Sequence, residues 1–146
     1  ATCPPLRVGG ACESMDAMSE PSTDTRLAPC PEAPNCVCSD ATDRPHRIAP
    51  LTLTVPADQA WRAVERLLSS QPRTTLVASS QGYLKAECRT RWLRFVDDLE
   101  LELRPQARQI AVRSASRVGH SDLGVNRRRV EALRRQLAAQ GVVSAE

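Results

Sequence analysis

The sequence predicts an α+β protein with a single two-layer domain, in which a curved antiparallel sheet of about five strands carries two helices on one face. Three observations support this prediction. Apolar and polar residues alternate in several short segments, two other segments place apolar residues at helical spacing, and short links join most of the strands. Strands joined by short links pair antiparallel, and the helices that flank such a run cover one face of the sheet.

The N-terminal part of the chain lacks these patterns. Residues 1–28 are interpreted as an irregular arm rich in Cys and Pro, and residues 29–146 as the single domain. Such an arm buries too little apolar surface to offset its ordering entropy, so it needs disulfides or another surface to lie on. We therefore expect the arm to dock on another protein subunit.

The first regular segments are a strand and a helix. LTLTVP at residues 51–56 alternates as a strand does, and residues 57–70 have the spacing of an amphipathic helix. Asp58 favours the first turn of this helix. Trp61 is expected in the core, on the inner side of the helix.

Four strands and a second helix follow. The strands are predicted at residues 74–78, 83–95, 99–104 and 109–113. One face of the longest strand carries Leu84, Ala86, Cys88, Thr90 and Trp92. Asn126 is expected to cap the final helix, which Gly141 ends. This order of elements is similar to the helix-grip arrangement, in which a curved sheet wraps a long terminal helix.

The composition excludes several classes of protein. A net charge of +3 is too small for a general nucleic-acid binder. No run of about eighteen apolar residues is present, so no membrane-spanning segment is expected. Aromatic residues make up only 3% of the chain, which predicts a core built mainly from Leu, Val, Ile and Ala. No cofactor-binding motif is found, and no cofactor is expected.

The cysteines predict an oxidising compartment. The chain contains six, an even number, and five of them lie within residues 1–50, where no stretch holds the period of a strand or a helix. The chain also begins at Ala1 without Met, so we expect a periplasmic protein from which a leader has been removed. Reduced thiols in a cytosolic protein are the alternative.

The spacing of the cysteines suggests disulfides. Cys30 and Cys36 flank a tight turn that suits a small closed loop. Cys38 and Cys88 are then left for each other, and Cys3 for Cys12, although six cysteines permit about fifteen pairings. A metal site on Cys30, Cys36 and Cys38 is the alternative, but a matching C-x-x-C is lacking, so no metal is expected.

A dense polar cluster follows the last strands. The candidate site residues are Asp97, Asp98, Arg113, Ser114, Ser116, Arg117, Asp122, Asn126 and Arg127. In the functional interpretation, arginine forks and helix N–H groups bind an anion. In the structural interpretation, Asp97 or Asp98 pairs with an arginine, and Asp122 caps a turn.

Catalysis is not expected from this cluster. Asp97 and Asp98 are adjacent in a strand, so their side chains point to opposite faces and cannot form an acid/base pair on one side. The serines lack a neighbouring base other than His120, and no nucleophile elbow is present. No catalytic residue is therefore assigned.

Several segments carry a family resemblance. CPEAPNCVCSD, HRIAPL, YLKAECRTRWLRFVDDLE and RSASRVGHSDLGVNRRRVEALR resemble the uncharacterised family named domain of unknown function 1499, from Cys30 to about Gln140. Its members occur in bacteria, often exported or membrane-attached, and in plastids. The resemblance implies a fold and a compartment more than a function. Cys38 stands where that family is expected to have serine.

Two function classes are expected from these observations. The first is a non-catalytic accessory or interaction subunit of an extracytoplasmic or membrane-associated complex. The alternative is a binding module for a small anionic or amphipathic ligand, held by the loop from Arg113 to Arg127.

Overall fold

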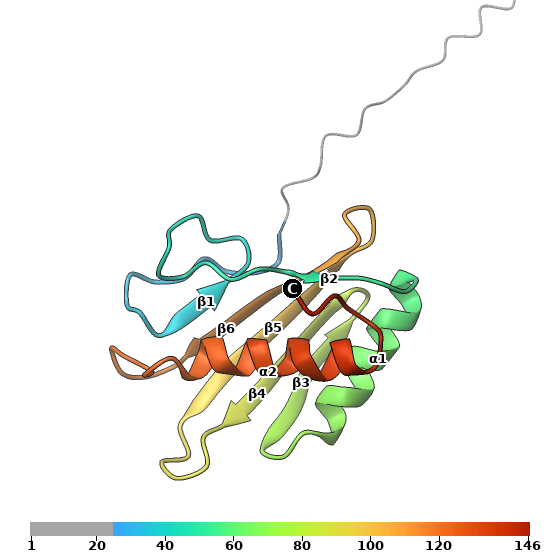
Figure 1. Cartoon of the computed structure of the whole chain (residues 1–146). Helices are drawn as coiled ribbons and strands as arrows, with labels where there is room; N and C mark the ends of the chain where they lie inside the picture. The colour runs from blue at the N-terminus through green and yellow to red at the C-terminus, as the bar shows by residue number, and fades with distance from the viewer. Residues whose placement is uncertain (1–24) are drawn as a thin grey trace, which may run out of the picture.

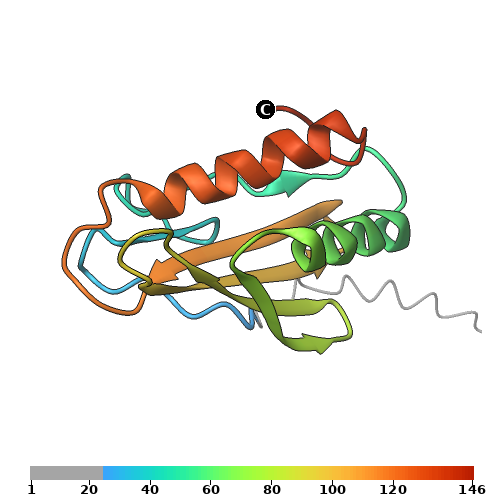
Figure 2. The same ribbon diagram turned by 90° about the horizontal axis from the view of Figure 1, so that it is seen from below.

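The computed structural model describes residues 25–146, which form an α+β unit with one layer of strands and one layer of helices. The described elements are β1 (Cys36–Cys38), β2 (Leu51–Thr52), α1 (Ala57–Ser70), β3 (Thr74–Ser80), β4 (Tyr83–Arg89), β5 (Val96–Arg104), β6 (Gln109–Ser116) and α2 (Val125–Ala139). Figure 2 shows both helices on the same side of the curved sheet. The predicted fold class is confirmed.

The sheet is antiparallel throughout. Its strand order is β1-β6-β5-β4-β3, and β2 also pairs with β6 (Figure 1). β1 and β2 thus share one edge of β6, because β1 pairs near its end and β2 near its start. Three consecutive hairpin connections join β3 to β6, which is the arrangement that the short links predict.

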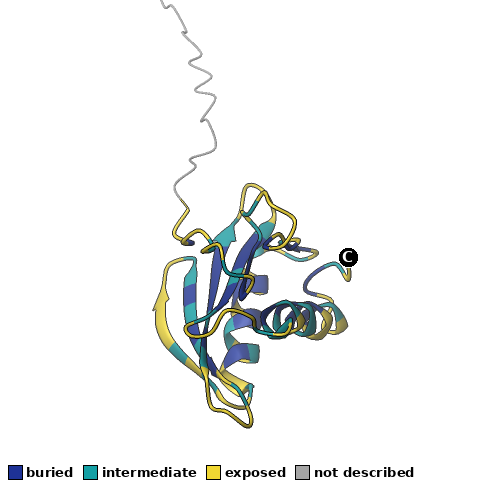
Figure 3. Cartoon of the chain, turned by 90° about the vertical axis from the view of Figure 1, so that its left-hand side faces the viewer, coloured by how far each residue is buried: buried dark blue, intermediate teal, exposed yellow. Residues whose placement is uncertain are grey.

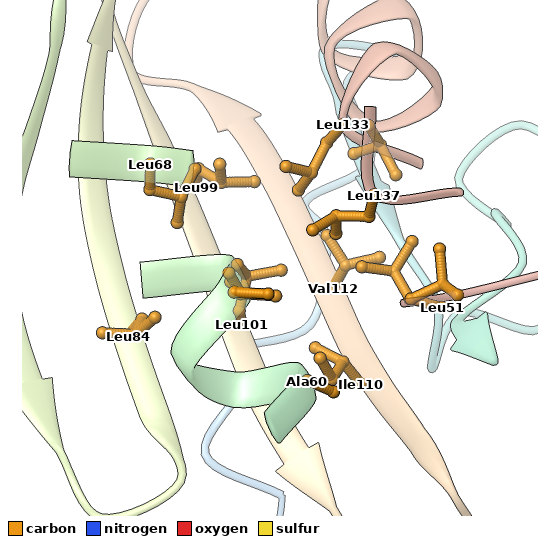
Figure 4. Packing of buried hydrophobic residues seen from close by; sticks show 14 of the residues in the cluster. Leu51, Ala60, Leu68, Leu84, Leu99, Leu101, Ile110, Val112, Leu133 and Leu137 are labelled. Atoms are coloured by element: carbon orange, nitrogen blue, oxygen red, sulfur yellow. The ribbon is translucent and has the colours of Figure 1, made fainter. Parts of the chain in front are cut away.

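The core lies between the sheet and the helices. Leu99 and Leu101 from β5 and Val112 from β6 meet Leu133 and Leu137 from α2 (Figure 4). Trp61 is buried among them, as its helical position predicts. The strand alternation therefore puts one face of β4, β5 and β6 into a dry core, and Figure 3 shows the burial concentrated there.

The opposite face of the sheet is partly covered by the chain before β1. Leu27 is buried there with Cys38 and Ala111 in a small second cluster. The main-chain N–H of Arg26 donates to Glu102 Oε2 at 2.7 Å. The described end of the predicted arm therefore lies on this domain, while residues 1–24 fall outside the described residues.

The strands differ from the sequence prediction at several boundaries: β3, β5 and β6 are two or three residues longer than predicted, and two predicted strands are much shorter. The predicted strand over residues 51–56 is only the two-residue β2, and β1 is an additional strand. The predicted strand over residues 83–95 ends at Arg89. Trp92 was expected on the strand face that carries Leu84, but it is 83% exposed, because the β4–β5 ladder ends at Arg89 and the chain turns back within residues 90–95.

The disulfide prediction is confirmed for one pair and wrong for another. Cys30 and Cys36 are bonded. Cys38 and Cys88 are free and buried, and the expectation that they pair is wrong because β1 and β4 are separated by β6 and β5. With strands about 4.8 Å apart, the spacing across the sheet alone separates them by roughly 14 Å, which is beyond the reach of a disulfide. The candidates Cys3 and Cys12 lie outside the described residues.

Candidate functional site

Two loops emerge at one end of the sheet. Since β4, β5 and β6 are antiparallel neighbours, the hairpin turn at residues 90–95 and the β6–α2 loop at residues 117–124 leave the sheet at the same end (Figure 1). The sheet register places Asp97 opposite Ser116 just beneath them. This end of the molecule therefore combines two loops with the last polar residues of the strands.

An open cleft of about 500 Å³ lies between the two loops. Its apolar walls are formed by Trp92, Leu93, Phe95, Val118, Leu123 and Val125. Among the described residues, six large apolar side chains are exposed, and five of them belong to these walls. We call this feature the loop cleft. Exposed apolar side chains gathered in one place are typical of a binding surface.

The floor of the loop cleft is polar. Asp97, Ser116 and Asp122 reach it from β5, β6 and the following loop. Asp97 is only 2% exposed, so it lies deep in the floor. Three of the residues selected from the sequence therefore meet at one site, and the site combines apolar walls with oxygen acceptors.

A buried amide organises the side chains below the floor. Asn126 is fully buried, and its Oδ1 accepts from Ser114 Oγ at 2.7 Å. Its Nδ2 lies 2.9 Å from Asp122 Oδ2, 2.8 Å from Ser116 Oγ and 3.1 Å from the main-chain oxygen of Asn35. One amide from α2 thus links β6, the β6–α2 loop and the chain before β1.

A buried ion pair completes this network. Arg129 from α2 donates from Nη2 to Asp97 Oδ2 at 2.6 Å. Its Nη1 donates to Asn126 Oδ1 at 2.7 Å and to Ser114 Oγ at 3.1 Å. The arginine therefore compensates the deeply buried carboxylate, which would otherwise be costly to bury.

Asp122, and not Asn126, caps α2. The helix begins after Gly124, whose φ of 79° favours glycine, while Asn126 already lies inside the first turn. Asp122 Oδ1 accepts from the Gly124 N–H at 2.9 Å, and Oδ2 accepts from the Asn126 N–H at 3.0 Å. The prediction for Asn126 is wrong because its amide is used by the buried network.

The hydrogen bonds to Asp122 change its acidity. Burial alone would raise the pKa of this carboxyl, but the main-chain N–H and the amide of Asn126, with the Gly124 N–H, outweigh it and lower the pKa below its ordinary value. Asp122 is therefore held in its charged form at the edge of the loop cleft.

Asp98 lies on the other face of the sheet from Asp97, as strand geometry predicts. It accepts from Arg117 in a bidentate pair at 3.0 and 2.8 Å, and Arg117 also donates to Glu87 at 2.8 Å. The hydrogen bonds from Arg117 lower the pKa of Asp98. Arg113 is paired with Glu100 on this same face at 3.0 Å. These groups form an ionic row away from the loop cleft.

Arg127 points to a third place. It donates to the main-chain oxygens of Arg47 and Pro45, at 2.9 and 3.1 Å. Arg113 and Arg117 are used by carboxylates of the sheet. The three arginines selected from the sequence are thus not brought together, and they do not form an anion site at the loop cleft.

Sequence reasoning missed most of the walls of the loop cleft. Trp92, Leu93 and Phe95 were assigned to a strand, because the alternation of β4 continues in the letters beyond its true end. Arg129 was also missed, since nothing in RRR distinguishes the arginine that faces Asp97. The run RWLR, with two apolar residues between arginines, was the signal for an exposed turn.

The hydroxyl of Ser116 has no general base in its hydrogen bond with Asn126. The Ser116 hydroxyl accepts a hydrogen bond from the amide of Asn126, and an amide cannot take its proton. Within residues 25–146, no three His, Cys, Asp or Glu side chains cluster in a way that would hold a metal ion. What the arrangement can do is bind: its walls are apolar and its floor accepts hydrogen bonds.

The comparison with family models gives one match. The model described as Protein of unknown function (DUF1499) matches residues 26–137. The chain belongs to this family. In this DUF1499 chain, the match includes both loops of the cleft and every residue of the buried network. No curated protein and no solved structure matches the sequence or the fold. None of the helices in the described part of the chain is long and apolar enough to cross a membrane.

Proposed function

We propose that this DUF1499 chain is a non-catalytic binding protein and that the loop cleft holds the apolar part of an amphipathic ligand. The observation that carries this proposal is the cleft itself, about 500 Å³ in volume with apolar walls and a polar floor. Ligand sites in proteins usually have this size and this combination of surfaces.

The floor indicates the chemistry of the ligand's polar end. Asp97, Asp122 and Ser116 present oxygen atoms, and the lowered pKa of Asp122 keeps that carboxyl a charged acceptor. A hydroxyl or amine head group could donate to them, whereas a carboxylate or phosphate would meet like charge. Arg129 offsets the charge of Asp97, and Arg91 lies at the rim of the loop cleft. Asp122, however, has no arginine within ion-pair distance among the described residues, and Arg113 and Arg117 lie on the far face of the sheet. The amphipathic ligand is therefore favoured over the anionic one.

An accessory subunit of an extracytoplasmic or membrane-associated complex is the second candidate. The observation that favours it is the strong exposure of the cleft walls, with Trp92 and Leu123 each 83% exposed. A partner protein would remove these side chains from water. The disulfide between Cys30 and Cys36 supports an oxidising, periplasmic compartment for either role.

A titration with a monomeric amphiphile tests the proposal. Trp61 is buried and Trp92 lines the loop cleft, so decanol added below its solubility limit should shift the emission of Trp92 alone. It should also raise the melting temperature through preferential binding to the folded state. Trp92→Phe should lose the fluorescence change and keep the thermal shift.

Two variants decide whether the loop cleft is responsible. Val118→Asp places a charge on the wall and should weaken decanol binding about tenfold or more. Val77→Asp alters the one exposed large apolar side chain outside the cleft, among the described residues, and should bind decanol as the wild type does. Equal binding by both variants, or tighter binding of decanoate than of decanol, would contradict the proposal.

A further inference from the structure

The rim of the loop cleft carries positive charge that has no partner. Arg91 and Arg94 flank the exposed pair Trp92 and Leu93 at the tip of the hairpin turn, and both arginines are exposed. Neither forms an ion pair with any carboxylate of the described residues. Asp97 below them is, by contrast, compensated by Arg129.

The second loop adds to the same rim. Leu123 is 83% exposed, and Arg128 donates to its main-chain oxygen at 2.8 Å. The guanidinium of Arg128 is exposed, and no carboxylate of residues 25–146 is within ion-pair distance of it. The two loops lie at one end of the molecule (Figure 1). Their exposed apolar side chains and uncompensated arginines are therefore gathered at that end.

The aromatic ring at the tip has a suitable environment for an interface between water and lipid. The guanidinium of Arg91 lies over the Trp92 ring, 5.2 Å from its centroid. Tryptophan prefers the headgroup level of a bilayer, and a neighbouring arginine can contact lipid phosphates while its stem stays on the apolar surface. Apolar insertion and charge attraction together give stable peripheral binding where one alone gives little.

We propose that this rim docks on the surface of an anionic lipid bilayer, with Trp92, Leu93 and Leu123 inserted at the headgroup level and Arg91, Arg94 and Arg128 on lipid phosphates. The proposal goes beyond ligand binding in the loop cleft and does not require it. The positive charge of the rim favours an anionic bilayer over a second copy of this chain. A second copy would bring the same arginines face to face, and like charges at close range oppose such a dimer.

Vesicle binding by the full chain tests the proposal. Vesicles of phosphatidylcholine with one quarter phosphatidylglycerol should pull the protein down, and vesicles of phosphatidylcholine alone should do so much less. High salt should weaken the binding, because it screens the arginines. The emission of Trp92 should move to shorter wavelength on binding, since the ring leaves water.

Matched variants separate the two contributions. Trp92→Ser with Leu93→Ser should lower the partition coefficient about tenfold or more for anionic vesicles. Arg91→Gln with Arg94→Gln should lower it about tenfold for anionic vesicles and leave the weak binding to neutral ones unchanged.

The control variants remove similar groups elsewhere. Arg66→Gln with Arg135→Gln takes two exposed arginines from the helices, and Val77→Ser takes an exposed apolar side chain from β3. Both should bind anionic vesicles within about twofold of the wild type.

Several outcomes would overturn the proposal. The first is that the wild type does not bind anionic vesicles. The second is that the rim variants bind them as well as the control variants do. The third is that the protein forms a dimer in solution and the Trp92→Ser/Leu93→Ser variant does not. A protein that binds decanol but not vesicles would reject membrane docking and keep the cleft ligand. One that binds vesicles but not decanol would do the opposite.

Discussion

Arg129→Met is expected to destabilise the domain strongly. The substitution keeps an unbranched side chain of similar length but removes the guanidinium that meets Asp97 Oδ2 at 2.6 Å. Asp97 is 2% exposed and Arg129 18% exposed in their side chains, so water replaces little of the lost interaction. The substitution leaves a carboxylate buried without its counter-ion, which costs more than the pair itself contributes.

The magnitude follows from this geometry. Removing one partner of a buried ion pair costs about 3–5 kcal/mol, and the partial exposure of Arg129 places the expected loss near 3 kcal/mol. The hydrogen bond between Ser114 and Asn126 does not need the arginine and should persist. For a domain of this size, the loss corresponds to a fall in melting temperature of about 10 °C.

Urea unfolding and a thermal scan measure the effect, and two further variants interpret it. Asp97→Asn combined with Arg129→Met removes both charges and should be more stable than Arg129→Met alone, because no charge is left stranded. Arg117→Met removes an arginine whose side chain is 43% exposed, and it should melt within about 2 °C of the wild type. Arg117 is one of the candidate site residues selected from the sequence, and it pairs with Asp98.

Two results would refute this reasoning. If Arg129→Met has the melting temperature of the wild type, Asp97 and Arg129 do not form a buried ion pair in solution. If the double variant melts no higher than Arg129→Met, the loss comes from packing of the side chain and not from a stranded carboxylate.

Three further predictions concern acid, the buried thiols and the disulfide. Asp122→Asn should be less stable than the wild type at neutral pH, and the difference in the free energy of unfolding should narrow as the pH falls below about 4. The reason is that a carboxyl with a lowered pKa stabilises the fold above its unfolded pKa and stops doing so once it is protonated. Urea unfolding from pH 7 to 2 checks this, and a constant difference would argue against it. Burial raises the pKa of Cys38 and Cys88, so both thiols should resist alkylation in the native protein and react on unfolding, which peptide mapping detects. Reduction of the Cys30–Cys36 bond, which closes a short loop, should lower the free energy of unfolding by about 2 kcal/mol, and an unchanged urea midpoint would count against that estimate.

The sequence by itself determined the elements that depend on local pattern. Alternation over β4, β5 and β6 and helical spacing in α1 and α2 are properties of neighbouring residues, so the α+β class could be predicted from them. The opposite directions of Asp97 and Asp98 also follow from the strand alone. The tight turn between Cys30 and Cys36 is local as well, and their disulfide was predicted for that reason.

Tertiary structure decided which polar residues meet. Any of several arginines could have paired with Asp97, and the angle at which α2 crosses the sheet selected Arg129. The same crossing turned Asn126 inward to a buried network and left the cap of the helix to Asp122. The sequence gives the charge of each side chain, but the direction in which a helical side chain points depends on how the helix packs.

The loop cleft depended on tertiary structure for a related reason. Alternation continues in the sequence past Arg89, yet a strand ends where its partner turns away, and that point is set by the pairing of β4 with β5. Trp92 consequently lies in a turn and not in the core. The cleft exists because antiparallel pairing brings that turn to the same end of the sheet as the loop before α2. A local sequence pattern does not indicate how close these two loops lie.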